Sequence, residues 1–149
     1  MRPSYVPKTL AQMTASWFVA SPEEAAEATR SSANAIKRLE QNGVPWALGA
    51  DEGNSPAYTT FFHGVASQIE LEALETVGIP PDRLIAAATT TPAKMLGVSH
   101  RLGTIEVGKQ ADLIILEDNP LTEGMKAFRT LEWTIAKGHA RTPAAWLTK

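Results

Sequence analysis

A short apolar run from Val44 to Ala50 constrains the fold of this 149-residue chain more than any other feature. The run lies between Gly43 and a polar stretch that begins with Asp51, and apolar residues do not alternate with polar ones along it. A run of this length and pattern is typical of a strand that is buried on both faces. The residues before it, from Ser21 to Gln41, have helical spacing and a hydroxyl cap, so we expect the helix–strand succession of α/β folds.

Three more helices are predicted before residue 98. The first spans about Ser67 to Val77, with apolar residues at helical spacing. The second begins at Pro80-Pro81 and the third at Thr91-Pro92, since proline is favoured in the first turn of a helix. Gly97 closes the third helix.

The pattern changes near Ser99, where the chain begins to resemble a series of short strands. Residues 102–106 and 111–116 flank the turn at 107–110 and predict one β-hairpin. Residues 131–136 and 139–141 flank Lys137-Gly138 and predict a second. We therefore expect two parts, an α/β part over residues 1–98 and an all-β part over residues 99–149.

Composition excludes several classes of partner and structure. The formal net charge is −2, so no broad basic field is available for nucleic acid. No apolar run approaches the roughly 20 residues that span a bilayer. Cysteine is absent, which excludes disulfides and thiolate metal sites. These features leave the compartment open, with the cytoplasm favoured.

Two stretches in the second half of the chain carry a family resemblance. Residues 88–97 read ATTTPAKMLG, and residues 102–116 read LGTIEVGKQADLIIL. Together they resemble the C-terminal signature of the metal-dependent amidohydrolase superfamily, and most closely its imidazolonepropionase-like and Xaa-Pro dipeptidase-like members. Asp118-Asn119-Pro120-Leu121 and the turn at Ala136-Lys137-Gly138 fit the same pattern.

The resemblance implies a (β/α)₈ TIM barrel beside a small β-sandwich. Residues 4–10 would then lie near barrel strand seven, residues 21–41 would form helix seven, and residues 44–50 would form strand eight. The strands after Ser99 would belong to the sandwich, which is built jointly with strands from elsewhere in the sequence. This chain would be the C-terminal piece of a larger hydrolase.

Asp51 is the candidate catalytic residue and the candidate metal ligand. A carboxylate at the carboxyl end of a buried strand is where α/β enzymes place chemistry, although a loop or helix-capping aspartate is the alternative. By resemblance, Asp51 matches the aspartate that ends strand eight of the family's metal site, for which we expect a divalent metal, zinc above all. A metal lowers the pKa of bound water to about 7, and a carboxylate that touches this water can take its proton.

The histidines are weaker candidates for the site than Asp51. His63 lies in the loop that would overhang the barrel mouth, so we interpret it as a substrate contact, with a surface-loop histidine as the alternative. The family's ligand histidines belong to other strands, and this chain has only His63, His100 and His139, without a His-x-His pair. We expect His100 and His139 to be structural or exposed, and Asp112 to be a turn or strand-edge carboxylate.

The expected function is metal-dependent hydrolysis of a C–N bond other than a standard internal peptide bond, in a cyclic amide, an imide or a dipeptide. One aspartate cannot hold a catalytic zinc, which needs about three protein ligands, so the chain alone is predicted to be inactive. Its incomplete barrel predicts aggregation, or association with the missing N-terminal part or with further copies. The alternatives are a non-catalytic remnant or partner-binding module and, third, a complete small α/β binding domain.

Overall fold

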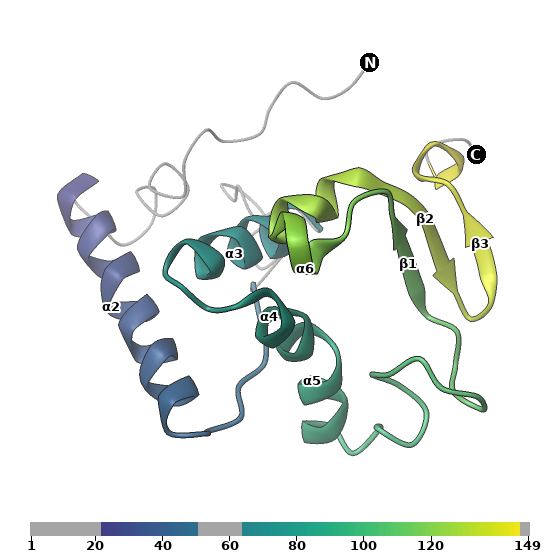
Figure 1. Ribbon diagram of the computed structural model, residues 1–149, viewed down its shortest axis with the longest axis horizontal. Coiled ribbons are helices and arrows are strands. Elements are labelled where there is room, and N and C mark those ends of the chain that lie inside the picture. The colour runs from purple at the N-terminus through teal and green to yellow at the C-terminus, as the bar shows by residue number, and fades with distance from the viewer. Residues whose placement is uncertain (1–21, 51–63, 147–149) are drawn as a thin grey trace, which may run out of the picture.

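The computed structural model describes residues 22–50 and 64–146, which form a group of helices beside a small sheet (Figure 1). The elements follow one another in the order α2 (Pro22–Gln41), α3 (Val65–Thr76), α4 (Pro81–Ala88), α5 (Thr90–Met95), β1 (Leu113–Leu116), α6 (Pro120–Glu123), the 3₁₀ helix η1 (Met125–Thr130), β2 (Leu131–Ala136), β3 (His139–Arg141) and the 3₁₀ helix η2 (Pro143–Trp146).

The four predicted helices are confirmed. α2 ends at Gln41, and Gly43 adopts a φ of 65°, a left-handed conformation that suits glycine at the end of a helix. α3 begins two residues earlier than predicted, and α4 begins at the second proline of Pro80-Pro81. The cap expected at Ser21 and the short strand expected over residues 4–10 lie outside the described residues.

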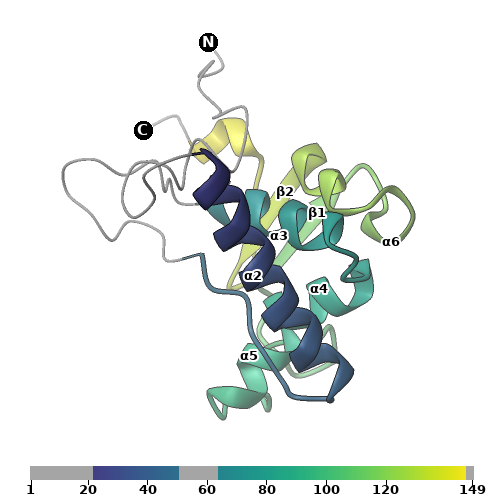
Figure 2. The same ribbon diagram turned by 90° about the vertical axis from the view of Figure 1, so that its left-hand side faces the viewer.

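The strand predicted over residues 44–50 does not form among the described residues, so this prediction is wrong. The segment leaves the end of α2 and runs back beside the helices (Figures 1 and 2), but no described strand pairs with it. A strand needs a neighbouring strand whose backbone accepts and donates hydrogen bonds along its length. The predicted burial on both faces is also wrong, because Trp46, Leu48 and Ala50 are half-buried while Ala47 and Gly49 are exposed.

One hydrophobic core joins the helices to the C-terminal part. It consists of the buried side chains Leu71, Leu74, Ile79, Leu84 and Met125. Leu84 and Met125 are fully buried, and each such side chain contributes about 1.5–3 kcal/mol relative to exposure. Because Met125 comes from η1, the core crosses residue 98, and the division into parts 1–98 and 99–149 stays a prediction.

The part after Ser99 is a mixture of strands and helical turns, and the all-β prediction is therefore wrong. Its sheet is antiparallel with the order β1-β2-β3. The predicted hairpin of β2 and β3 is confirmed, with Lys137 and Gly138 at φ values of 50° and 82°. Two consecutive positive φ values make the two-residue turn that matches strand twist, which favours glycine at the second position.

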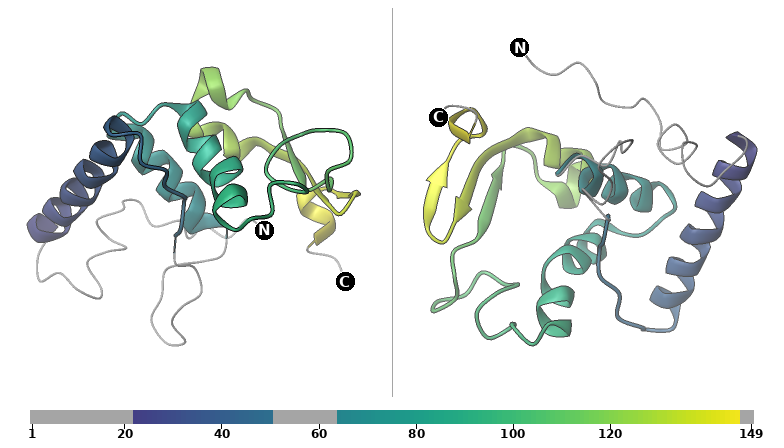
Figure 3. Two further views of the ribbon diagram at one scale, coloured as in Figure 1. Left: turned by 90° about the horizontal axis from the view of Figure 1, so that it is seen from below. Right: turned by 180° about the vertical axis from the view of Figure 1, so that it is seen from behind.

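The first predicted hairpin is wrong, because β1 pairs with β2 and residues 102–106 form no strand. Residues 101–110 instead form a loop between α5 and β1 (Figure 3), closed by a backbone hydrogen bond from Gln110 N to Arg101 O. Gly103, with a φ of 95°, lies against α5, where an added Cβ would come within 2.6 Å of Ala93 Cβ. At Gly103 the loop therefore lies close against the helices.

The helices in the described part of the chain are too short or too polar to cross a membrane.

Candidate active site

Asp51 and His63, the two candidate site residues, lie outside the described residues. The structure does describe the two elements between which they stand in the sequence. The segment 44–50 leads directly to Asp51, and Gly64, the N-cap of α3, directly follows His63. How these two elements are held therefore bears on the position of any site formed there.

Three hydrogen bonds hold the segment 44–50 against the helices, and the first runs from the backbone N–H of Val44 to the carbonyl of Leu39 in the last turn of α2, at 2.9 Å. The backbone N–H of Leu48 donates to the carbonyl of Ala87 on α4, at 2.9 Å. The indole Nε1–H of Trp46 donates to Oε1 of Glu40, at 2.5 Å. The Trp46 and Leu48 side chains also pack against the hydrophobic core, so one side of the segment is fixed while Ala47 and Gly49 on the other side remain exposed.

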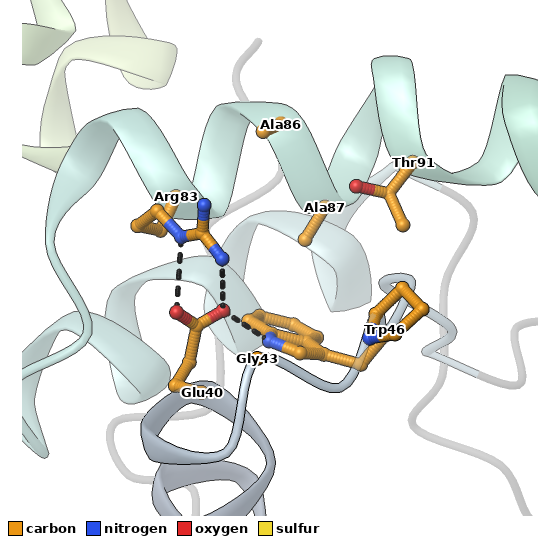
Figure 4. A pocket seen from close by; sticks show the side chains of 8 residues that line it. Glu40, Gly43, Trp46, Arg83, Ala86, Ala87 and Thr91 are labelled. Carbon is orange, nitrogen blue, oxygen red and sulfur yellow. Dashed lines mark hydrogen bonds and ion pairs between the residues drawn. The ribbon is translucent and has the colours of Figure 1, made fainter.

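Glu40 connects this segment to two helices (Figure 4). It lies in the last turn of α2 and accepts from Arg83 of α4, with 2.9 Å from Nε to Oε2 and 3.3 Å from Nη2 to Oε1. Partial burial raises the pKa of the Glu40 carboxyl, but hydrogen bonds from Arg83 and Trp46, with the Arg83 charge, outweigh it and hold the pKa below 4.5. Glu40 is therefore ionised at neutral pH.

A small pocket of about 130 Å³ lies beside this network. Its lining is shown in Figure 4 and consists of Glu40, Gly43, Pro45, Trp46, Arg83, Ala86, Ala87 and Thr91. The Glu40 and Arg83 charges pair with each other, and the pocket adjoins the beginning of the segment, at Pro45 and Trp46. Because its two charged side chains are satisfied by each other, we interpret this pocket as structural.

α3, which follows His63, is fixed by two carboxylates that point to the C-terminal part. Glu72 accepts two hydrogen bonds from Arg129, each 2.7 Å long. Glu75 accepts from the backbone N–H of Met125 at 2.9 Å, and it lies so close to Gly124 that a Cβ there would come within 2.5 Å of its Oε1. α3 is thus connected to η1 at Glu72 and at Glu75, three residues apart on the helix.

Sequence reasoning missed Glu40, Trp46 and Arg83 as a unit. One signal was available for Glu40, because a carboxylate in the last turn of a helix faces the negative end of the helix dipole and is unfavourable there. Such a residue calls for a cationic partner, and Arg83 is that partner. The identity of the partner could not be found, because 43 positions separate the two residues and no local pattern connects them.

The other predicted side chains lie where they were expected. His100 and His139 are both exposed. Asp112 is a turn carboxylate: its Oδ1 accepts the backbone N–H of Lys137 at 2.7 Å, which stabilises the β2–β3 turn. That hydrogen bond lowers the pKa of the Asp112 carboxyl, and the smaller effect of burial, which raises the pKa, does not offset it.

Within residues 22–50 and 64–146, no group of three or more histidine, cysteine, aspartate or glutamate side chains could hold a metal ion. These residues therefore do not fit a metal centre by themselves.

Comparison with known proteins gives a consistent result. A model of the amidohydrolase family matches residues 5–140. An imidazolonepropionase of Symbiobacterium thermophilum is 37% identical over 82 residues, which are 54% of this chain and 18% of that protein. A 5-methylthioadenosine/S-adenosylhomocysteine deaminase of Teredinibacter turnerae is 37% identical over 86 residues, which are 56% of this chain and 20% of that protein.

Solved structures agree with the sequence relatives. A Xaa-Pro dipeptidase with methionine bound in its active site is 26% identical, with a TM-score of 0.66 over 81% of this chain and 28% of that one. The chain thus spans about a fifth of the length of these curated relatives.

Proposed function

Because the chain belongs to the amidohydrolase family, we propose that it forms part of a hydrolase that cleaves a C–N bond other than a standard internal peptide bond. The relatives support this class of reaction, since their names describe an imidazolonepropionase, a deaminase and a Xaa-Pro dipeptidase. The substrate would be a cyclic amide, an imide or a dipeptide. The chain would supply the last part of the barrel and some strands of the composite β-sandwich.

The observation that carries the proposal is the alternation of burial before Asp51. Trp46 and Leu48 pack against the helices and Ala50 is half-buried, whereas Ala47 and Gly49 are exposed. Continued by one residue, this alternation predicts that Asp51 follows Ala47 and Gly49 on the side away from the helices. In a barrel that side is the interior, and the end of the strand is where catalytic groups stand.

In this proposal Asp51 has the role of proton-transfer group and metal ligand. Its carboxylate would take a proton from the attacking water and return it to the leaving nitrogen. His63 would contact the substrate; it stands next to Gly64, the N-cap of α3, and α3 is fixed to η1 through Glu72 and Glu75.

The family generally uses a divalent metal, and we expect zinc. The described residues do not form a site for it. The ligands beside Asp51 would therefore have to come from outside the described residues.

A second candidate function is supported by exposed apolar residues. Ile105 and Val107, in the loop 101–110, are 84% and 107% exposed, and Leu96, which follows α5, is 75% exposed. Where such side chains form one apolar patch, the patch marks contact with another protein. In this alternative the chain is a non-catalytic remnant or a partner-binding module, and these residues contact the partner.

One pair of assays separates the two functions. The complete gene product that contains this chain, and the 149-residue chain by itself, are incubated with zinc and with a panel of cyclic amides, imides and Xaa-Pro dipeptides. We expect metal-dependent hydrolysis from the complete gene product and none from the 149-residue chain. Absence of hydrolysis from the complete gene product across the panel would favour the non-catalytic module.

A further inference from the structure

Glu40 is placed where a helix does not favour a carboxylate. It lies in the last turn of α2, at the end of the helix that carries the partial negative charge of the helix dipole. Only 18% of its side chain is exposed, so water does little to offset this position. Two hydrogen-bond donors to the carboxylate offset this unfavourable position instead: the Arg83 guanidinium and the Trp46 indole. Glu40 therefore accepts hydrogen bonds from Arg83 of α4 and from Trp46 of the segment 44–50.

Trp46 and Leu48 are fixed at positions two residues apart, on the same side of the segment. Trp46 bonds to the end of α2 and Leu48 bonds to Ala87 on α4. The side chains of an extended chain alternate, and a slip by one residue moves every side chain to the other face and displaces the chain by about 3.3 Å. Two bonds at this spacing set the register of the segment against the helices.

The register matters because the segment makes no ladder with any strand that the structure describes. Hydrogen bonds to a neighbouring strand would otherwise fix the position of each residue. Here the backbone bonds of Val44 and Leu48 and the indole–carboxylate bond of Trp46 hold the segment, together with the half-buried packing of the Trp46 and Leu48 side chains.

We infer that Glu40 and Trp46 are positioning residues, which set the register of residues 44–50 and through it the place of Asp51, five residues after Trp46. This inference rests on the proposed function of Asp51. Neither side chain touches the substrate; both act through the backbone that leads to the carboxylate. Arg83 supports them, since its two bonds fix the Glu40 carboxylate in the orientation that receives the indole N–H.

The test uses the complete gene product and steady-state kinetics. Trp46→Phe removes the N–H donor and keeps an aromatic ring, and Glu40→Ala removes its acceptor. Trp133→Phe, at an exposed position of β2, is the matched control. We expect Trp46→Phe and Glu40→Ala each to lower kcat roughly 10- to 100-fold with KM unchanged, since a displacement of about 1 Å has effects of this size. Trp133→Phe should leave kcat unchanged.

Combination with Asp51→Asn distinguishes positioning from general loss of stability. If Trp46 acts through Asp51, adding Trp46→Phe to Asp51→Asn lowers kcat no further than Asp51→Asn does by itself. Glu40→Ala must give the same result, and it carries the test if the Trp46→Phe protein does not fold.

Three results would overturn the inference. Trp46→Phe and Glu40→Ala could lower kcat by the same factor with and without Asp51, which would mean a merely structural role. They could leave kcat unchanged while Asp51→Asn reduces it, which would end the inference and leave the proposed function standing. Asp51→Asn could itself leave kcat unchanged, which would end both.

Discussion

The Glu72 carboxylate of α3 and the Arg129 guanidinium of η1 form a two-bond ion pair across 57 positions of the chain, with both bonds 2.7 Å long. The pair joins the helix that follows the candidate site to the C-terminal part. Beside it, Glu75 holds the backbone of Met125, whose side chain is fully buried in the shared core. Ionic and apolar contacts therefore connect the same two elements.

Loss of this pair is expected to lower the stability of the chain. Arg129→Ala should reduce the free energy of unfolding by about 1 kcal/mol, because the pair has two-bond geometry although Arg129 is 55% exposed. Urea unfolding at low micromolar concentration measures the change. Arg30→Ala is the control, since the Glu27–Arg30 pair is exposed and lies within one helix, and it should cost less than about 0.5 kcal/mol. Equal losses for the two variants would contradict the assigned role.

The same pair predicts a dependence of stability on pH. The hydrogen bond from Arg129 lowers the pKa of Glu72, and partial burial opposes this less strongly, so the folded pKa lies below 4.5. A carboxylate with a depressed folded pKa contributes its full stabilisation above the unfolded value and loses it as pH falls through the folded value. The difference in unfolding free energy between the wild type and Glu72→Gln should therefore shrink from pH 6 to pH 3. A difference that stays constant would show that the ionised pair contributes nothing.

Two glycines of the loop 101–110 allow a matched comparison. Gly103 and Gly108 have φ values of 95° and 89°, so alanine is strained at both, by about 1–2 kcal/mol. At Gly103 the new Cβ would also come within 2.6 Å of Ala93 Cβ, whereas at Gly108 it would meet nothing within 4 Å. Gly103→Ala should therefore destabilise the chain by about 1–3 kcal/mol more than Gly108→Ala. Thermal unfolding of both variants measures this, and similar melting temperatures would show that the loop does not pack on α5 in solution.

Met125→Ala tests whether one core joins the two parts of the chain. Removing this fully buried side chain should cost about 2–5 kcal/mol of unfolding free energy. Because Met125 packs with Leu71, Leu74 and Leu84, the loss should accelerate amide exchange in α3 and α4 as well as in η1. Faster exchange confined to residues after 98 would indicate two independent parts.

The sequence predicted helices better than strands, and the reason is local. Helix limits at Gln41, Pro81 and Gly97 depend on caps, prolines and glycines within a few residues. A strand depends on its neighbour, which the local pattern does not contain. The segment 44–50 has the composition of a buried strand but no partner strand among the described residues, and residues 102–106 form no strand, with Gly103 against Ala93 of α5.

The candidate site was predictable to a similar extent. Asp51 stands out by its place after an apolar run and by the family resemblance, and both are properties of contiguous sequence. The residues that hold the run are not contiguous: Glu40 meets Arg83 from 43 positions away. Asp112 shows the opposite case, because the sequence indicated a turn carboxylate and the structure confirms it with the bond from Lys137.

Substitution of Asp51 in the complete gene product tests the central claim most directly. Asp51→Asn keeps the size of the side chain and removes the group that accepts a proton. Asp82→Asn, at an exposed position in the first turn of α4, is the matched control. The measurement is kcat for metal-dependent hydrolysis of the best C–N substrate. The account predicts a loss of about 100- to 10,000-fold for Asp51→Asn and almost none for Asp82→Asn. An Asp51→Asn enzyme that hydrolyses the substrate at the wild-type rate would contradict it.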